Sequence, residues 1–117
     1  MKKILSLTAI ATTVLIFSNC SSSKKATAAA PAKFNYETNV QAVIAANCAP
    51  CHIPSKGGNK RPYDNFANVK ADIDEIIRRI ELTPGTRGFM PFKGTAKLSD
   101  STINVFKQWK TDGLLEK

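Results

Sequence analysis

The most constraining feature of this 117-residue chain is the run Cys48-Ala49-Pro50-Cys51-His52. It holds two of the three cysteines and the only histidine of the chain. A structural zinc site needs four cysteine or histidine ligands, and residues 34–117 contain only these three. A thioredoxin-like redox pair requires a β-α-β pattern around its cysteines, and the sequence shows none. A plain disulfide would leave the position of the single histidine unexplained.

Cys-x-x-Cys-His is instead the attachment motif of a c-type haem. Thiols separated by two residues reach the two vinyl groups on one side of the porphyrin and form thioethers. The histidine that follows then lies beneath the iron and binds it as the proximal axial ligand. Its other ring nitrogen should donate a hydrogen bond to a backbone carbonyl, which fixes the tautomer and the ring orientation. The sequence therefore predicts one covalently bound haem c on Cys48, Cys51 and His52.

A second axial ligand is expected because iron in an electron carrier is usually held on both faces. The only methionine beyond the first residue is Met90, inside a loop of 15 residues that spans 83–97. Loops of this length in small domains are usually functional, and Pro91 favours an extended backbone at the residue before it. We predict Met90 as the sixth ligand. Two alternatives stay open: Met90 only fills a gap in the core, or a lysine or no side chain takes the position.

The first 19 residues have the three-part pattern of a secretory signal peptide. Lys2 and Lys3 precede an apolar stretch over residues 4–17, and Ser18-Asn19 form a polar exit. An apolar stretch of about 14 residues is shorter than the roughly 20 that span a bilayer. An uncleaved membrane helix is the alternative. We predict export, with a signal peptide over residues 1–19.

Cys20 follows the apolar stretch directly, in an arrangement that resembles a bacterial lipoprotein signal. This resemblance implies that Cys20 is lipidated and anchors the protein to a membrane, for which we favour the periplasmic face of the outer membrane. The alternative is a free or disulfide-forming cysteine beside an ordinary cleavage site. Residues 20–33 are then the anchor and a flexible linker, and residues 34–117 form the folded domain.

The formal charge of +8 does not indicate a nucleic-acid partner. Residues 34–117 hold 12 lysines and arginines against 9 aspartates and glutamates, a net charge of +3. Charges of both signs are mixed along this part of the chain, which is typical of a solvated surface and not of a stripe that follows phosphates.

Three segments carry apolar residues at three- and four-residue intervals, the spacing of a helix with one buried face. They run over residues 37–47, 72–82 and 99–112. Ser99 is placed to cap the last helix and Gly113 to end it. The acidic residues of the middle helix are interpreted as its solvated face: Asp72, Asp74 and Glu75. We expect an all-α domain of three to four short helices, with a thin core that a bound cofactor completes.

Over residues 36–115 the chain resembles a class I monohaem cytochrome c. The resemblance rests on the attachment motif at 48–52, the Gly-x-Met-Pro segment at 88–91 and the Leu-Ser-Asp start of a last helix at 98–100. It implies that the first and last helices cross and that the haem lies between the histidine and methionine loops. The residues placed at this crossing are Val40, Val43, Ile44, Ile103, Phe106 and Trp109.

The family also implies a function and two further sets of contacts. A proline carbonyl steadies the axial histidine, for which we favour Pro62 over Pro54. The candidates for contact with the haem propionates are Arg61, Tyr63, Arg87 and Lys93. The implied function is one-electron transfer between a redox donor and an acceptor protein, without catalysis, by a monomer or a subunit of a complex. The alternatives are a haem enzyme or gas sensor with an open iron site, and a haem relay inside a larger oxidoreductase.

Overall fold

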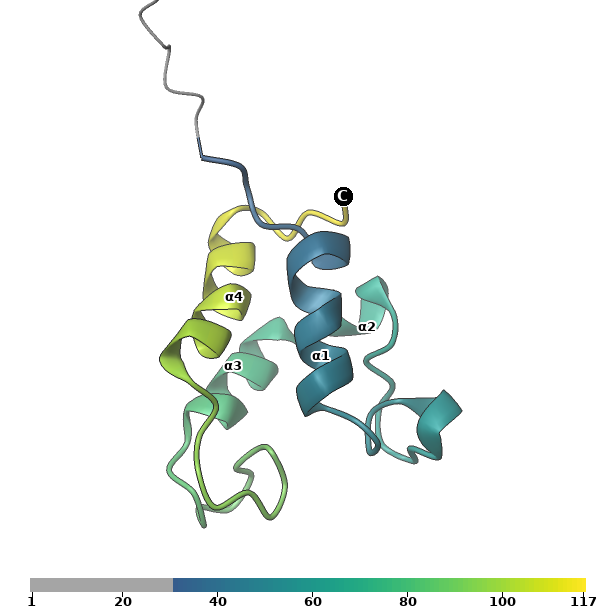
Figure 1. The fold of residues 1–117 in the computed structure, drawn as a ribbon, viewed down its shortest axis with the longest axis vertical. Coiled ribbons are helices and arrows are strands. Elements are labelled where there is room, and N and C mark those ends of the chain that lie inside the picture. The colour runs from purple at the N-terminus through teal and green to yellow at the C-terminus, as the bar shows by residue number, and fades with distance from the viewer. Residues whose placement is uncertain (1–30) are drawn as a thin grey trace, which may run out of the picture.

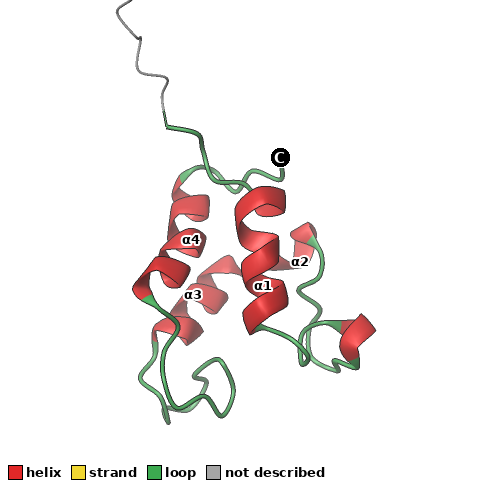
Figure 2. Ribbon diagram, in the orientation of Figure 1, coloured by secondary structure: helices red, strands yellow, loops and turns green. Residues whose placement is uncertain are grey.

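The computed structural model describes residues 31–117, so the predicted signal peptide, the lipidation site Cys20 and most of the linker lie outside the described residues. The described part is a small all-helical domain with four α-helices and no strand (Figure 2), which confirms the predicted fold class at this level. No described helix has both the length and the apolar character to cross a membrane. The α-helices are α1 Gln41–Asn47, α2 Phe66–Ala71, α3 Ile73–Glu81 and α4 Asp100–Thr111.

The first helix begins as a π-helical turn over Tyr36–Val40 and continues without a break as α1. Asn35 caps it, because its side-chain oxygen accepts a hydrogen bond from the Thr38 N–H at 2.8 Å. The helix therefore starts one residue before the predicted segment and ends with it at Asn47. The apolar spacing identified this helix correctly.

The helices α3 and α4 confirm the other two predicted segments to within one residue at each end. Ser99 is the N-cap of α4, and its hydroxyl accepts a hydrogen bond from the Thr102 N–H at 3.2 Å. Gly113 ends α4 with a φ of 102°, a conformation that favours glycine.

The six-residue helix α2 was not predicted, and neither was a single 3₁₀ turn over Pro54–Lys56. Asn65 caps α2 by accepting a hydrogen bond from the Asn68 N–H at 2.9 Å. Val69 is the one fully buried residue of this helix. A helix this short has too few apolar residues for a periodicity to emerge.

The core lies where the first helix, α3 and α4 meet (Figure 1). The π-helical turn packs against α4, and α3 packs against α4 and α2. Five of the six residues predicted at the crossing of the first and last helices are buried, and Val43 is half-buried at its edge. The buried residues of this core are Tyr36, Val40, Ile44, Ile53, Val69, Ile73, Ile76, Ile80, Ile103, Phe106 and Trp109.

Two long loops leave the same end of this helical core (Figure 1). One runs from Cys48 to Asn65 and contains the 3₁₀ turn; we call it the attachment loop. The other joins α3 to α4 over residues 82–99 and has no helix or strand; we call it the methionine loop. It contains the predicted 83–97 loop, which is therefore confirmed as irregular. These two loops carry every described residue that the sequence predicted to hold haem.

Candidate functional site

The attachment motif is a tight turn that continues directly from α1. Cys48 is the C-cap of that helix, and its N–H donates to the Ile44 carbonyl at 2.8 Å. Within the motif, the His52 N–H donates to the Cys48 carbonyl at 3.0 Å and the Ile53 N–H to the Pro50 carbonyl at 3.0 Å. The backbone of the motif is thus held by its own hydrogen bonds at the end of a helix that is anchored in the core.

The segment that follows the motif folds back onto it. The Gly58 N–H donates to the Ile53 carbonyl at 3.1 Å, and the Lys60 N–H donates to the Cys51 carbonyl at 3.0 Å. A Cβ atom at Gly58 would lie 2.3 Å from the Pro50 carbonyl oxygen, which is far inside van der Waals contact. Only glycine permits this approach, so Gly58 is a site residue that the sequence analysis missed. The Gly57-Gly58 pair, which residues 53–56 separate from the motif, was the available signal.

The two cysteines of the motif are free thiols. Cys48 is half-buried against the core, and Cys51 is exposed. Burial raises the pKa of the Cys48 thiol to about 11, so this side chain is protonated at neutral pH. No cluster of three or more histidine, cysteine or acidic side chains that could hold a bare metal ion occurs in residues 31–117.

The imidazole of His52 is held by residues 61–63 of the same loop. Its Nδ1 lies 2.7 Å from the carbonyl oxygen of Arg61, which makes Nδ1–H the donor and leaves Nε2 as the nitrogen with a free lone pair. The ring of Tyr63 stacks on the imidazole, with 4.5 Å between centroids and 8° between planes. Tyr63 also donates its backbone N–H to the His52 carbonyl at 2.9 Å.

The carbonyl that accepts the His52 Nδ1–H therefore belongs to Arg61. The prediction that it belongs to Pro62 or Pro54 is wrong. The Pro62 carbonyl accepts a hydrogen bond from the Asn68 side chain at 3.0 Å, and the Pro54 carbonyl accepts from the Gly57 N–H at 2.9 Å. The bond from Tyr63 N–H to the His52 carbonyl sets the register of this segment. That register places the carbonyl of Arg61, one residue earlier than expected, at Nδ1.

Met90 sits in the methionine loop and is fastened to α3. Its backbone N–H donates to the carbonyl of Arg79, in the last turn of that helix, at 3.2 Å. The neighbouring Phe89 is buried, and the side chain of Met90 is half-buried and contacts the core. The loop therefore has one firm anchor beside the predicted ligand.

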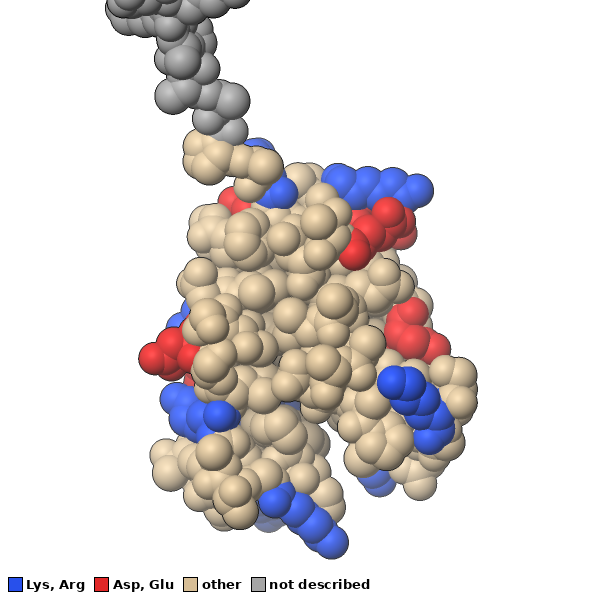
Figure 3. Space-filling model, viewed as in Figure 1, with Lys and Arg blue, Asp and Glu red and all other residues tan. Residues whose placement is uncertain are grey.

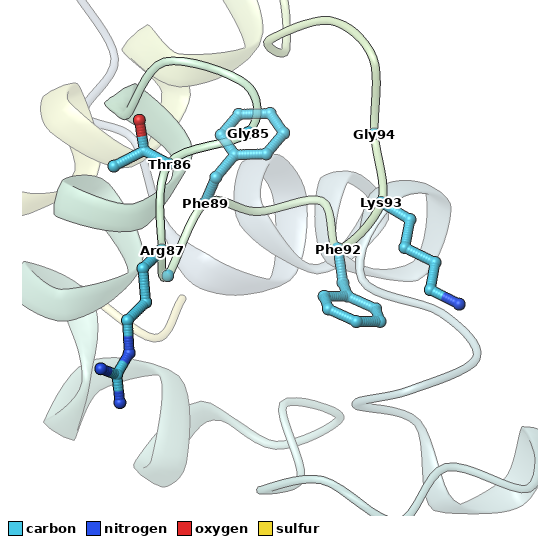
Figure 4. A pocket seen from close by; sticks show the side chains of 8 residues that line it. Gly85, Thr86, Arg87, Phe89, Phe92, Lys93 and Gly94 are labelled. Carbon is cyan, nitrogen blue, oxygen red and sulfur yellow. The ribbon is translucent and has the colours of Figure 1, made fainter.

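An open pocket of about 390 Å³ lies in the methionine loop (Figure 4). Its lining comes from this loop alone and includes none of the attachment motif: Gly85, Thr86, Arg87, Gly88, Phe89, Phe92, Lys93 and Gly94. Phe92 is 68% exposed, the most exposed of the large apolar side chains described. Figure 3 shows a notch in the molecular surface at the end where both loops lie. The predicted ligands thus occupy two loops at one end of the domain, and the pocket is lined by sequence neighbours of Met90 but not by Met90 itself.

Two of the four propionate candidates are already engaged with Asp72. The Arg61 side chain forms an ion pair with this carboxylate, and the Tyr63 hydroxyl donates to it at 3.1 Å. Arg87 and Lys93 are exposed on the pocket of the methionine loop. Burial, and then the nearby Asp72 carboxylate, raise the pKa of Tyr63 to about 12, so its hydroxyl remains a donor.

Asp72 does not belong to a solvated face, contrary to the prediction. Its side chain is 25% exposed and is directed at Arg61 and Tyr63. Asp74 and Glu75 fit the prediction better, because they are more exposed and pair with basic residues at the surface. No sequence signal indicated that Asp72 reaches a loop nine residues away, because that contact depends on how the loop returns to α3.

No family model matches this chain, and neither does any curated protein or solved structure. The chemistry of the site therefore rests on its own residues. These are two unpaired thiols, one imidazole with a fixed Nδ1–H, and one thioether on a neighbouring loop.

Proposed function

We propose that the chain is a c-type cytochrome that carries single electrons outside the cytoplasm. Cys48 and Cys51 attach one haem c covalently, and His52 and Met90 bind its iron. When bound, the haem supplies an iron that alternates between the ferrous and ferric states. The observation that carries the proposal is the bond of 2.7 Å between His52 Nδ1 and the Arg61 carbonyl oxygen. A ligand histidine almost always donates its other ring N–H in this way.

The chain's own residues support each part of this assignment. The Arg61 carbonyl fixes the tautomer of His52, so that Nε2 carries the lone pair that binds iron. Met90 provides a thioether sulfur, a weak donor that favours the ferrous state and raises the reduction potential. Phe92, which is 68% exposed and lines the pocket, offers an apolar surface that suits contact with a porphyrin, with the Lys93 ammonium 5.5 Å from its ring centroid.

A dithiol redox function is less consistent with the site. A reactive thiol of such a pair has a pKa lowered by nearby positive charge or by a helix N-terminus. Cys48 lies at the C-terminal end of α1, and burial raises its pKa. The described fold also lacks the strands of a thioredoxin-like domain. No group in the site is arranged as a nucleophile with a general base, so we propose an electron carrier and not an enzyme.

An open iron site is the second candidate, and one observation favours it. The side chain of Met90 contacts the apolar core and is half-buried, as expected of a methionine that only fills space. In that case the protein would be a haem enzyme or a gas sensor. The two candidates share the attachment chemistry and differ in the sixth ligand.

The test uses the full-length protein exported by a host that attaches c-type haem, with absorption spectra in both redox states. We expect a haem spectrum that acidified organic solvent does not extract from the chain, because thioethers hold the porphyrin. The variant Cys48→Ser/Cys51→Ser should lose this covalent pigment. The control Ala49→Ser changes the same turn and should keep it. Colourless, correctly exported protein would refute the proposal.

The same material decides between the two candidates. Carbon monoxide should bind slowly to the reduced protein, because Met90 must first leave the iron, and rapidly to Met90→Leu, which keeps the volume but lacks the sulfur. Lys97→Ala, a change at an exposed residue of the same loop to which no role is assigned, should behave as the unmodified protein. Rapid binding to the unmodified protein would favour the open site. Partner proteins recovered in fixed ratio from detergent-treated membranes would instead favour a relay subunit of a larger complex.

A further inference from the structure

Asp72 precedes α3, yet its carboxylate does not cap that helix. An aspartate at this position usually accepts a hydrogen bond from one of the first helical N–H groups. The Asp72 side chain makes no such bond. Its Oδ2 atom instead accepts the Tyr63 hydroxyl at 3.1 Å and pairs with Nε of Arg61. One carboxylate oxygen thus bridges two side chains of the attachment loop.

These two residues are the ones that hold the predicted axial histidine. The Arg61 carbonyl accepts the His52 Nδ1–H at 2.7 Å, and the Tyr63 ring stacks on the imidazole at 4.5 Å. The Tyr63 N–H donates to the His52 carbonyl at 2.9 Å. The contacts form a closed circuit in which Asp72 touches Arg61 and Tyr63, and both touch His52.

Asp72 is also tied to the core through the helix that it begins. It directly precedes Ile73, which is buried, and its carbonyl accepts the N–H of Ile76, also buried, at 2.9 Å. Arg61 is exposed. Tyr63 is half-buried against the core, but it belongs to no helix or strand. An exposed ion pair alone contributes little. A partly buried carboxylate that holds two groups at once can transmit the rigidity of a packed helix to the loop.

We propose that Asp72 is a positioning residue for His52, acting through Arg61 and Tyr63. The inference rests on the proposed function, since it concerns how the imidazole is presented to iron. A well-aligned bond from Nδ1–H to a carbonyl strengthens the imidazole as a donor. Loss of the Asp72 carboxylate releases residues 61–63, loosens that bond and weakens the donor. A weaker donor stabilises ferric iron less, so the reduction potential rises.

The test compares Asp72→Ala with Asp74→Ala in the full-length protein. Both variants remove one carboxylate at the start of α3, but Asp74 is exposed and pairs with Lys110 on α4, away from the attachment loop. Asp72→Ala should raise the reduction potential of the haem. It should also speed hydrogen exchange at His52 Nδ1, observed by NMR, by roughly 2- to 10-fold, the range expected when one hydrogen bond is weakened. Asp74→Ala should change neither quantity.

A second variant separates positioning from a general loss of structure. Tyr63→Phe removes only the hydroxyl and keeps the stacked ring, and it should shift both readouts in the same direction by less. In the double variant Asp72→Ala/Tyr63→Phe, the effect should be smaller than the sum of the single effects, because both changes break one contact. Additive effects, or identical values for Asp72→Ala and Asp74→Ala, would overturn the inference.

Failure of this inference can be told apart from failure of the proposed function. Protein that carries covalent haem but shows no difference between the two aspartate variants would refute only the role of Asp72. Exchange at His52 Nδ1 is measurable whether or not haem is attached. That readout therefore judges the positioning role even in protein that lacks the pigment.

Discussion

At the scale of single residues, the site depends on positions where the backbone itself is the contact surface. Gly58 has no side chain, and this absence lets its segment lie against the carbonyl groups of Pro50 and Cys51. His52 is likewise held by a main-chain oxygen, that of Arg61. This acceptor belongs to the backbone, so it is present whatever the side chain at position 61, but it meets Nδ1 only while residues 61–63 are held in place. Backbone position is therefore what the attachment loop has to preserve.

Gly58→Ala should destabilise the protein and impair haem attachment. The added Cβ would lie 2.3 Å from a backbone oxygen that cannot move aside, so the turn that carries both cysteines must shift. Overpacking of this kind costs about 1–3 kcal/mol. The measurements are the free energy of unfolding in denaturant and the ratio of covalent haem to protein.

Gly57→Ala is the matched control for this prediction. Gly57 has a φ of 81°, so alanine there is strained by about 1–2 kcal/mol, but no atom lies within 4 Å of the new Cβ. The control should lose stability and keep its haem content. Equal haem contents in the two variants would show that the contact of Gly58 with the motif is unimportant for attachment.

At the scale of elements, α3 connects the two loops that carry the predicted iron ligands. Asp72 at its beginning holds Arg61 and Tyr63 of the attachment loop, and the Arg79 carbonyl near its end holds the Met90 N–H. The two anchor residues are about 10 Å apart along a helix that rises 1.5 Å per residue. The inner face of this helix is fixed in the core by Ile73, Ile76 and Ile80. One short helix thus sets the spacing between the loops.

The outer face of α3 gives the protein an acid-sensitive contribution to stability. Hydrogen bonds from Arg78, and then from Arg79, lower the pKa of Glu75 to about 2. In the unfolded chain this carboxyl titrates near its ordinary value of about 4.3. The contribution is therefore complete above about pH 5 and declines as the pH falls toward 2, because the unfolded state binds the proton first.

Glu75→Gln should remove this part of the pH dependence. The difference in unfolding free energy between the unmodified protein and the variant should be constant above pH 5 and shrink between pH 5 and pH 2. Chemical denaturation at a series of pH values measures it. Glu75, Arg78 and Arg79 lie at the surface, so the difference in unfolding free energy should also fall with added salt. A difference that grows as the pH falls would contradict the assignment.

At the scale of the whole molecule, the two ends of the domain close on each other far from the loops. The N–H groups of Tyr36 and Glu37 donate to the carbonyls of Leu115 and Glu116 at 2.9 and 3.1 Å. The indole N–H of Trp109, which is fully buried, donates to the Leu115 carbonyl at 2.7 Å. The last residues therefore complete the helix crossing, and the two loops with the predicted iron ligands lie at the opposite end of it (Figure 1).

Removal of residues 115–117 should destabilise the whole domain. The deletion takes away the acceptors of the Tyr36 and Trp109 N–H groups, and each buried donor left without a partner costs about 1–3 kcal/mol. Removal of Lys117 alone is the control, because it loses only an exposed ion pair with Glu37. Thermal unfolding compares the two. Equal melting temperatures would show that the closure contributes nothing to stability.

Local patterns in the sequence were sufficient for most of the helical scaffold. Residues 37–47, 72–82 and 99–112 have apolar residues at helical spacing, and both Ser99 and Gly113 act where their chemistry predicts. These features involve residues close in the chain, so one sequence reveals them. The helix α2 was not predicted, because six residues are too few to show a helical periodicity.

The sequence alone determined the chemistry available to this protein: two cysteines and a histidine in one turn, and a single methionine in a long loop. The tertiary structure decided which groups surround them. Three features of the site depend on the path that the attachment loop takes back to the core. The Arg61 carbonyl, and not that of Pro62, accepts the His52 Nδ1–H; Gly58 contacts the motif; and the Asp72 carboxylate is directed at the loop and not at its own helix. That path is set by contacts between residues distant in the chain, which no local spacing encodes.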